Sequence, residues 1–124
     1  MIKKINLIVA TLYSIILAIV ETMLNWGDWQ YAPLWIVDYL IVIILLLAVF
    51  VFKKNLQRLM LLLGWTFSSG VMYMGLFLGL DPNTILIGFD KNILFSIALA
   101  LIVSVIGIIL TIIDKKEAEK DSTS

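Results

Sequence analysis

The sequence contains no histidine and no cysteine among its 124 residues. The absence of histidine removes imidazole acid–base chemistry and the commonest metal ligand. The absence of cysteine removes thiolate metal sites, thiol redox chemistry and disulfide bonds. The Walker, Rossmann and Gly-x-Ser-x-Gly patterns of nucleotide-binding and hydrolase sites are also missing. We therefore expect neither a metal site nor a bound cofactor, and the sequence favours a protein that is not an enzyme.

Charged side chains are scarce as well. Only 15% of the residues are charged, 62% are hydrophobic, and the mean hydropathy is +1.08. An ordinary soluble domain carries about 25% charged residues, so the composition excludes a soluble fold of this size. The formal net charge is zero. It therefore gives no reason to expect nucleic acid as a partner.

The apolar residues are gathered into four runs, each close to the ~20 residues that cross a ~30 Å hydrocarbon core. The runs cover residues 5–24, 34–52, 59–80 and 93–113. The links between them are short, which predicts a single domain over residues 1–124, an all-α membrane protein of four antiparallel transmembrane helices. Residues 114–124 alternate lysines with acids and predict a flexible, solvated tail.

The charges are distributed unequally between the two sides of this topology. One side carries only Lys91, and the other carries eight basic residues: Lys3, Lys4, Lys53, Lys54, Arg58, Lys115, Lys116 and Lys120. The positive-inside rule then places both termini in the cytoplasm. The preference for isoleucine and lysine, with a single arginine, is typical of a low-GC bacterium. We therefore predict a bacterial cytoplasmic (inner) membrane protein, with the lipid bilayer as its first partner.

Small residues recur at helical spacing in three of the four runs. They are Ala10, Ser14 and Ala18 in the first run, Gly64, Ser68, Gly75 and Gly79 in the third, and Ala100, Ser104 and Gly107 in the fourth. Each set returns to one face of its helix, where small residues allow close packing of helices in lipid. We interpret them as packing positions, and the alternative is that serines and threonines line a solute path. After Asp38 the second run has Ala48 as its only small residue, which predicts an outermost helix or one that contacts another subunit.

Two acidic residues lie within the predicted spans. Glu21 is four residues before the first outer link, and Asp38 is four residues into the second run. At 1.5 Å per residue both lie about 6 Å inside the outer boundary, at matching depth. One interpretation is structural, with Glu21 hydrogen-bonded among small residues and Asp38 at a helix N-terminus. The others are a cation or proton site and a hydrolytic pair that shares one proton.

Aromatic residues are concentrated around the first outer link. Trp26, Trp29, Tyr31, Trp35 and Tyr39 occur within fourteen positions of one another. Amphipathic rings are enriched where lipid headgroups meet water, so we interpret these residues as interface anchors. The alternative is an aromatic platform for a lipid or a cationic ligand.

Three hypotheses for the function follow. The first is a small non-enzymatic membrane protein that acts through helix packing, as an accessory subunit of a larger membrane complex or as a homo-oligomer. The second is a small cation- or proton-linked transporter or channel with Glu21 and Asp38 at its outer mouth. The third is an intramembrane hydrolase that uses the carboxylate pair, although the GxGD signature of intramembrane aspartyl proteases is absent.

Overall fold

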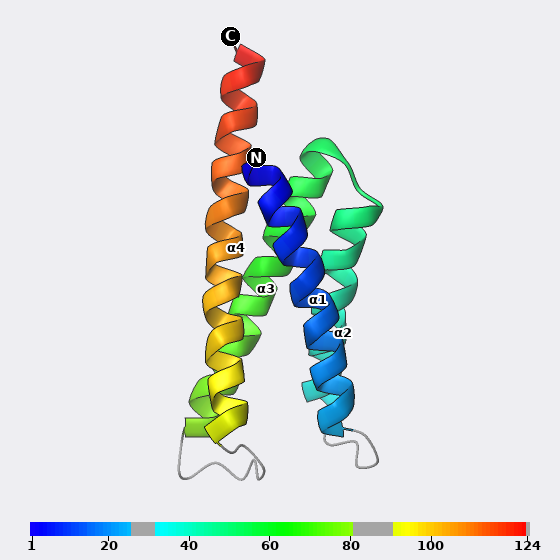
Figure 1. The fold of residues 1–124 in the computed structure, drawn as a ribbon, viewed down its shortest axis with the longest axis vertical. Helices are drawn as coiled ribbons and strands as arrows, with labels where there is room; N and C mark the ends of the chain where they lie inside the picture. Colours follow the sequence, from blue (N-terminus) through cyan, green and yellow to red (C-terminus); the bar gives the residue numbers. More distant parts are fainter. Residues whose placement is uncertain (26–31, 81–90, 124) are drawn as a thin grey trace.

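The computed structural model describes residues 1–25, 32–80 and 91–123 of the chain. They form four helices, α1 (Ile2–Asn25), α2 (Ala32–Phe50), α3 (Lys54–Leu80) and α4 (Lys91–Thr123). The helices run alternately up and down, so both termini and the α2–α3 connection lie at one end of the bundle (Figure 1). We call this the basic end, because all the basic residues of the chain except Lys91 lie on this side of the predicted topology. The opposite end, where α1 finishes and α2 begins, is called the acidic end.

Three of the helices are long and apolar enough to cross a membrane. The candidate segments are Ile2–Met23, Lys54–Phe77 and Leu94–Lys120, whereas the apolar segment Ile36–Phe50 of α2 is shorter. The outer surface of the bundle is also apolar, and Ile16, Leu59 and Ile109 each expose more than half of their area. An apolar surface of this extent is suited to lipid and not to water. These findings confirm an all-α four-helix fold and indicate an integral membrane protein.

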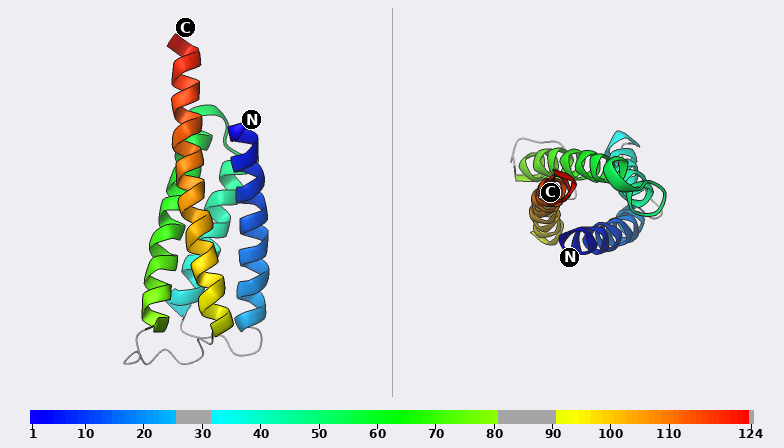
Figure 2. Two further views of the ribbon diagram at one scale, coloured as in Figure 1. Left: turned by 60° about the vertical axis from the view of Figure 1, so that its left-hand side comes forward. Right: turned by 90° about the horizontal axis from the view of Figure 1, so that it is seen from above.

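The helices pack in the cyclic order α1, α2, α3, α4, with α1 also contacting α4. Figure 2 shows this ring of helices from above. The hydrophobic core lies inside it and consists of Ala10, Tyr13, Ile41, Leu45, Ala48, Leu61, Trp65 and Met72. Three of these residues belong to α2, so the prediction of an outermost second helix is wrong. The large aliphatic residues of α2 fill space that the small residues of α3 leave open: Leu45 packs over Gly64.

The connection between α2 and α3 is short and held by side-chain hydrogen bonds. The Nε2 atom of Gln57 donates to the carbonyl oxygens of Ala48, at 3.0 Å, and Val49, at 3.3 Å. These carbonyls belong to the last turn of α2, where the helix itself supplies no partner. The chain reverses direction at Lys54, whose φ of 57° lies in the left-handed region. A side chain in this conformation costs about 1–2 kcal/mol, and the Gln57 contacts help to stabilise the turn.

The last helix is longer than the sequence predicted. The apolar run ends at residue 113, but α4 continues as a helix to Thr123, and its end projects beyond the other three helices (Figure 1). The helical structure replaces the predicted flexible tail over residues 114–123. The physical reason is that lysine, glutamate and alanine, which form most of this segment, are strong helix formers. The apolar part of α4 also supplies the nucleus from which the helix extends.

Candidate functional site

The two acidic residues of the predicted spans meet at the acidic end of the bundle. The side chain of Asp38, on α2, lies close enough to that of Glu21, on α1, for the two carboxyl groups to interact. Both side chains are half-buried. Ionised carboxylates offer only acceptors, so a hydrogen bond between these two groups requires one proton on the pair. The structure therefore brings the two acidic residues of neighbouring helices together, which the sequence had left open.

A second contact between α1 and α2 follows one residue further along each helix. The hydroxyl group of Thr22 donates to the carbonyl oxygen of Ala18 at 2.7 Å. It also lies 2.7 Å from the hydroxyl group of Tyr39, which therefore acts as the donor to Thr22. This contact sets the register of the two helices beside the acidic pair. Of the predicted interface anchors only Tyr39 is described here; the side chains of Trp26, Trp29, Tyr31 and Trp35 lie outside the described residues.

Three buried hydroxyl groups from three helices meet in the middle of the bundle. The Tyr13 hydroxyl lies 2.6 Å from Oγ of Ser68, which lies 2.7 Å from Oγ of Ser104. Ser104 donates its hydroxyl hydrogen to the carbonyl oxygen of Ala100 at 2.7 Å, and its Oγ atom lies 3.4 Å from the Tyr13 hydroxyl. The three residues come from α1, α3 and α4. Interhelical hydrogen bonds in membrane proteins contribute about 0.6 kcal/mol each on average, so this cluster stabilises the packing and also makes the interior polar.

A second buried network lies nearer the basic end. The indole nitrogen of Trp65 donates to Oδ1 of Asn6 at 3.0 Å, and Nδ2 of Asn6 donates to Oγ1 of Thr111 at 2.8 Å. Thr111 in turn donates to the carbonyl oxygen of Gly107 at 2.8 Å. The Trp65 ring packs edge-on against Tyr13, with ring centroids 5.1 Å apart, so the two networks are adjacent.

An ion pair lies at the basic end of the same interior. The Nε atom of Arg58, on α3, lies 3.4 Å from Oδ2 of Asp114, on α4, and both side chains are largely buried, at 15% and 9% exposed. Arg58 also donates to Oδ1 of Asn55 one turn earlier in α3. The pair joins the ends of two helices where the apolar run of α4 gives way to charged residues.

The polar groups of α1 show how these contacts are arranged along the bundle. Asn6, Tyr13 and Glu21 are separated by seven and eight residues, so they share one face of the helix. They span about 22 Å along the helix axis at 1.5 Å per residue. The interior therefore carries polar groups at successive depths from the acidic pair to the basic end. Ser14, on the same part of α1, is fully buried and has no hydrogen-bond partner among the described residues.

The predicted packing positions lie mostly inside the bundle. Six are buried: Ala10, Ser14, Gly64, Ser68, Ser104 and Gly107. Three others are half-buried: Ala18, Gly75 and Ala100. The surroundings of Gly79 lie outside the described residues. The stripes of small residues are thus largely used between helices of one chain, which leaves less of them for contacts with another subunit.

The sequence analysis missed Asn6, Tyr13 and Trp65 as members of the polar interior. A signal for two of them is present, because Asn6 and Tyr13 share the face of α1 that carries the small residue Ala10. Polar side chains on a small-residue face of a span are typical of a buried position. No pattern in α3 indicates that the indole of Trp65 reaches Asn6, since that contact depends on how two helices are placed.

No family model, curated protein or solved structure that was compared with this chain matches it. The function is therefore inferred from the contacts of the chain itself. Within residues 1–25, 32–80 and 91–123 there is no group of three or more acidic side chains arranged to hold a metal ion. The described contacts offer a pair of neighbouring carboxyl groups and hydrogen bonds along the interior.

Proposed function

We propose that the chain is a small proton-linked membrane transporter or channel whose outer proton-binding site is the pair Glu21 and Asp38. The observation that carries this proposal is the contact between the two carboxyl groups. A paired carboxyl site withdrawn from bulk water is the arrangement expected of a proton relay in a membrane. The hydroxyl cluster of Tyr13, Ser68 and Ser104 supports it, because it continues the polar interior toward the basic end.

Two features favour a proton over a metal cation as the transported ion. The carboxyl pair needs one proton to form its hydrogen bond, whereas hard cations such as Ca²⁺ take six or more oxygen ligands. The buried Trp65 indole also fills the interior between the two networks. A proton can be passed between hydrogen-bonded groups once water or side chains move, while a hydrated cation needs a continuous opening.

The proposal includes four membrane crossings with both termini in the cytoplasm. α2 has 19 residues, about 28 Å at 1.5 Å per residue, which is close to the ~30 Å hydrocarbon core. The basic residues at the end that holds both termini favour the cytoplasmic side for that end. The acidic pair then faces the outer side of a bacterial inner membrane.

Proton flux into liposomes tests this function. Purified protein is reconstituted into vesicles that contain a pH-sensitive dye, and a potassium gradient with valinomycin drives proton entry. We expect the wild-type protein to carry a flux that Glu21→Gln and Asp38→Asn each reduce at least about tenfold, because general acid–base groups contribute by factors of this size or more. Both substitutions keep the shape of the side chain. They replace a carboxyl group, which can bind and release a proton, with an amide, which can only form hydrogen bonds.

The matched control is Glu119→Gln, which removes one carboxyl group from an exposed position near the end of α4. This variant should carry the wild-type flux. A wild-type protein that carries no proton flux, or a flux that is the same in all three variants, would contradict the proposal. In vesicles without valinomycin, a potassium flux of equal size that does not depend on the two acids would contradict it as well.

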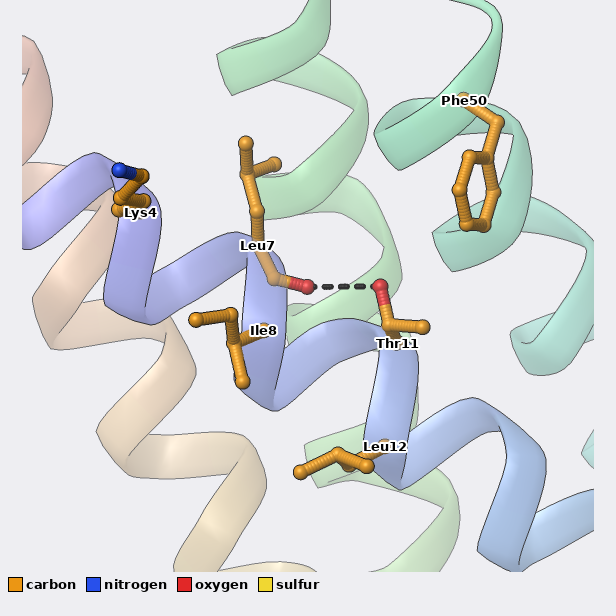
Figure 3. Close-up of a pocket in the computed structure, with 6 residues that line it drawn as sticks. All are labelled: Lys4, Leu7, Ile8, Thr11, Leu12 and Phe50. Atoms are coloured by element: carbon orange, nitrogen blue, oxygen red, sulfur yellow. Dashed lines mark hydrogen bonds between the residues drawn. The ribbon is translucent and has the colours of Figure 1, made fainter.

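A second candidate function, as an accessory subunit or a homo-oligomer, is favoured by a groove between α1 and α2. The groove has a volume of about 410 Å³ and is lined by Lys4, Leu7, Ile8, Thr11, Leu12 and Phe50 (Figure 3). Thr11 donates its hydroxyl hydrogen to the carbonyl oxygen of Leu7 at 2.8 Å, so it presents its methyl group and not a free donor. An apolar groove of this kind fits an apolar helix of a second copy or of a partner protein.

Native mass spectrometry from nanodiscs tests this second function. We expect the wild-type protein to appear as an oligomer or as a complex with a co-purified membrane protein. Ile8→Trp, which fills the groove, should weaken the association about fivefold or more, since burying a misplaced large side chain costs about 1–3 kcal/mol. Ile109→Trp on the exposed face of α4 is the matched control. A wild-type protein that is strictly monomeric and without a partner would contradict the candidate.

A further inference from the structure

A second groove, with a volume of about 600 Å³, lies between the beginning of α3 and the end of α4 at the basic end. Its lining is divided between cationic and apolar side chains. The cationic residues are Lys54, Arg58 and Lys115, and the apolar residues include Leu59, Leu62 and Ile112. This mixture distinguishes it from the apolar groove between α1 and α2.

The two kinds of side chain are separated along the bundle. On α3, Lys54 precedes Leu62 by eight residues, about 12 Å along the helix axis. On α4, Lys115 follows Ile112 toward the projecting end of the helix. The lysines therefore lie at the membrane-boundary end of the groove, and the leucine and isoleucine residues lie on the side of the membrane centre. Leu59 is 61% exposed, so the apolar part is open to surrounding lipid.

With Arg58 paired to Asp114, the charges that face the groove are two lysines and the carboxylate of Glu119. Arg58 is paired with Asp114, and Glu119 also lines the groove. Three cations against these two carboxylates give a net charge of +1. Lys54 and Lys115 are both exposed and come from different helices, on the two sides of the groove. The left-handed backbone of Lys54 places one of these cations directly after the chain reversal.

We propose that this groove binds an anionic phospholipid of the cytoplasmic leaflet, with its phosphate between Lys54 and Lys115 and an acyl chain along Leu59, Leu62 and Ile112. Basic pockets between transmembrane helices on the cytoplasmic side are suited to such headgroups. A soluble phosphate would leave the apolar half of the groove without a contact, and an apolar helix would leave the lysines without one. This proposal does not depend on proton transport by the acidic pair.

Lipid retention in native mass spectrometry tests the proposal. The full-length protein in mild detergent is titrated with phosphatidylglycerol or with phosphatidylcholine of the same acyl chains. We expect one tightly retained phosphatidylglycerol per chain, bound about tenfold more tightly than phosphatidylcholine. Replacing both lysines, in Lys54→Gln with Lys115→Gln, should weaken phosphatidylglycerol binding about tenfold, to the level of phosphatidylcholine, and leave phosphatidylcholine binding unchanged.

The matched control replaces Lys3 and Lys116, two exposed lysines at the same end that do not line the groove. Lys3→Gln with Lys116→Gln removes the same charge and should change phosphatidylglycerol binding by no more than about twofold, because exposed charges are screened. Equal binding of both lipids, or an equal loss in the two double variants, would overturn the proposal. Displacement of the lipid by millimolar glycerol phosphate, which has no acyl chain, would show that the groove binds the phosphate group alone and would overturn the proposal of a phospholipid.

Discussion

Gly107→Ala is expected to destabilise the bundle by about 2 kcal/mol or more, the largest effect of any single methyl group added at a described glycine. A Cβ atom at residue 107 would overlap three atoms of the Trp65 indole ring. The ring cannot move aside easily, because it is fully buried, donates to Asn6 and packs edge-on against Tyr13. The overlap outweighs the gain of about 1 kcal/mol in helix propensity that alanine brings over glycine.

The measurement is the free energy of unfolding in mixed micelles, obtained by SDS titration and followed by far-UV circular dichroism. Gly75→Ala is the matched control, since its new Cβ atom would lie 3.9 Å from the nearest atom of Ile97, an ordinary contact. That variant should be neutral or more stable by up to about 1 kcal/mol. Combining Gly107→Ala with Trp65→Leu should cost less than the sum of the two single changes, because the smaller side chain leaves room for the methyl group. Equal stabilities of the two glycine variants would contradict the close packing of α4 on α3.

Breaking the Arg58–Asp114 ion pair is expected to have the second large effect. Arg58→Met and Asp114→Leu should each lower the free energy of unfolding by about 3 kcal/mol, because each leaves a charged partner buried and unpaired. The double variant should lose clearly less than the sum of the two, since it removes both charges together. The same SDS titration provides the measurement.

Lys116→Met is the control for this cycle, because Lys116 is exposed at the same end of α4. A surface substitution of this kind usually changes stability by no more than about 0.5 kcal/mol. Additive losses in the double variant would show that the 3.4 Å approach of the two groups contributes no coupling energy. In that case the two uncharged hydrogen-bond networks, and not the ion pair, would be the main polar contacts that stabilise the packing of α3 and α4.

The helices of this fold can be predicted from the sequence because a membrane requires each spanning helix to have a certain length and an apolar composition. The runs over 5–24 and 59–80 lie within α1 and α3, since about 20 apolar residues are needed to satisfy the backbone across the hydrocarbon core. The last turns of α4 could not be predicted from apolar run length. Its last residues are charged and carry no apolar period, but they favour a helix by their intrinsic propensity.

The acidic pair was only half predictable. Equal depth of Glu21 and Asp38 follows from counting residues in two antiparallel helices. Their contact depends on the rotation of each helix, which the Thr22–Tyr39 hydrogen bond records. The single small residue of the second run suggested an outermost helix, yet the residues Ile41 and Leu45 are fully buried. In lipid a large aliphatic side chain suits both the outside and the inside, so α2 carries no pattern that separates the two.

The projecting end of α4 has a practical consequence. The helix has 33 residues, about 50 Å at 1.5 Å per residue, and therefore extends well beyond a ~30 Å hydrocarbon core. At 14.0 kDa the protein alone is a small target for single-particle imaging. A soluble helical protein fused in helical register to the end of α4 would act as a rigid fiducial, because the joint would be continuous helix and not a flexible linker. The orientation of that added mass would then report directly on the placement of the bundle in the membrane.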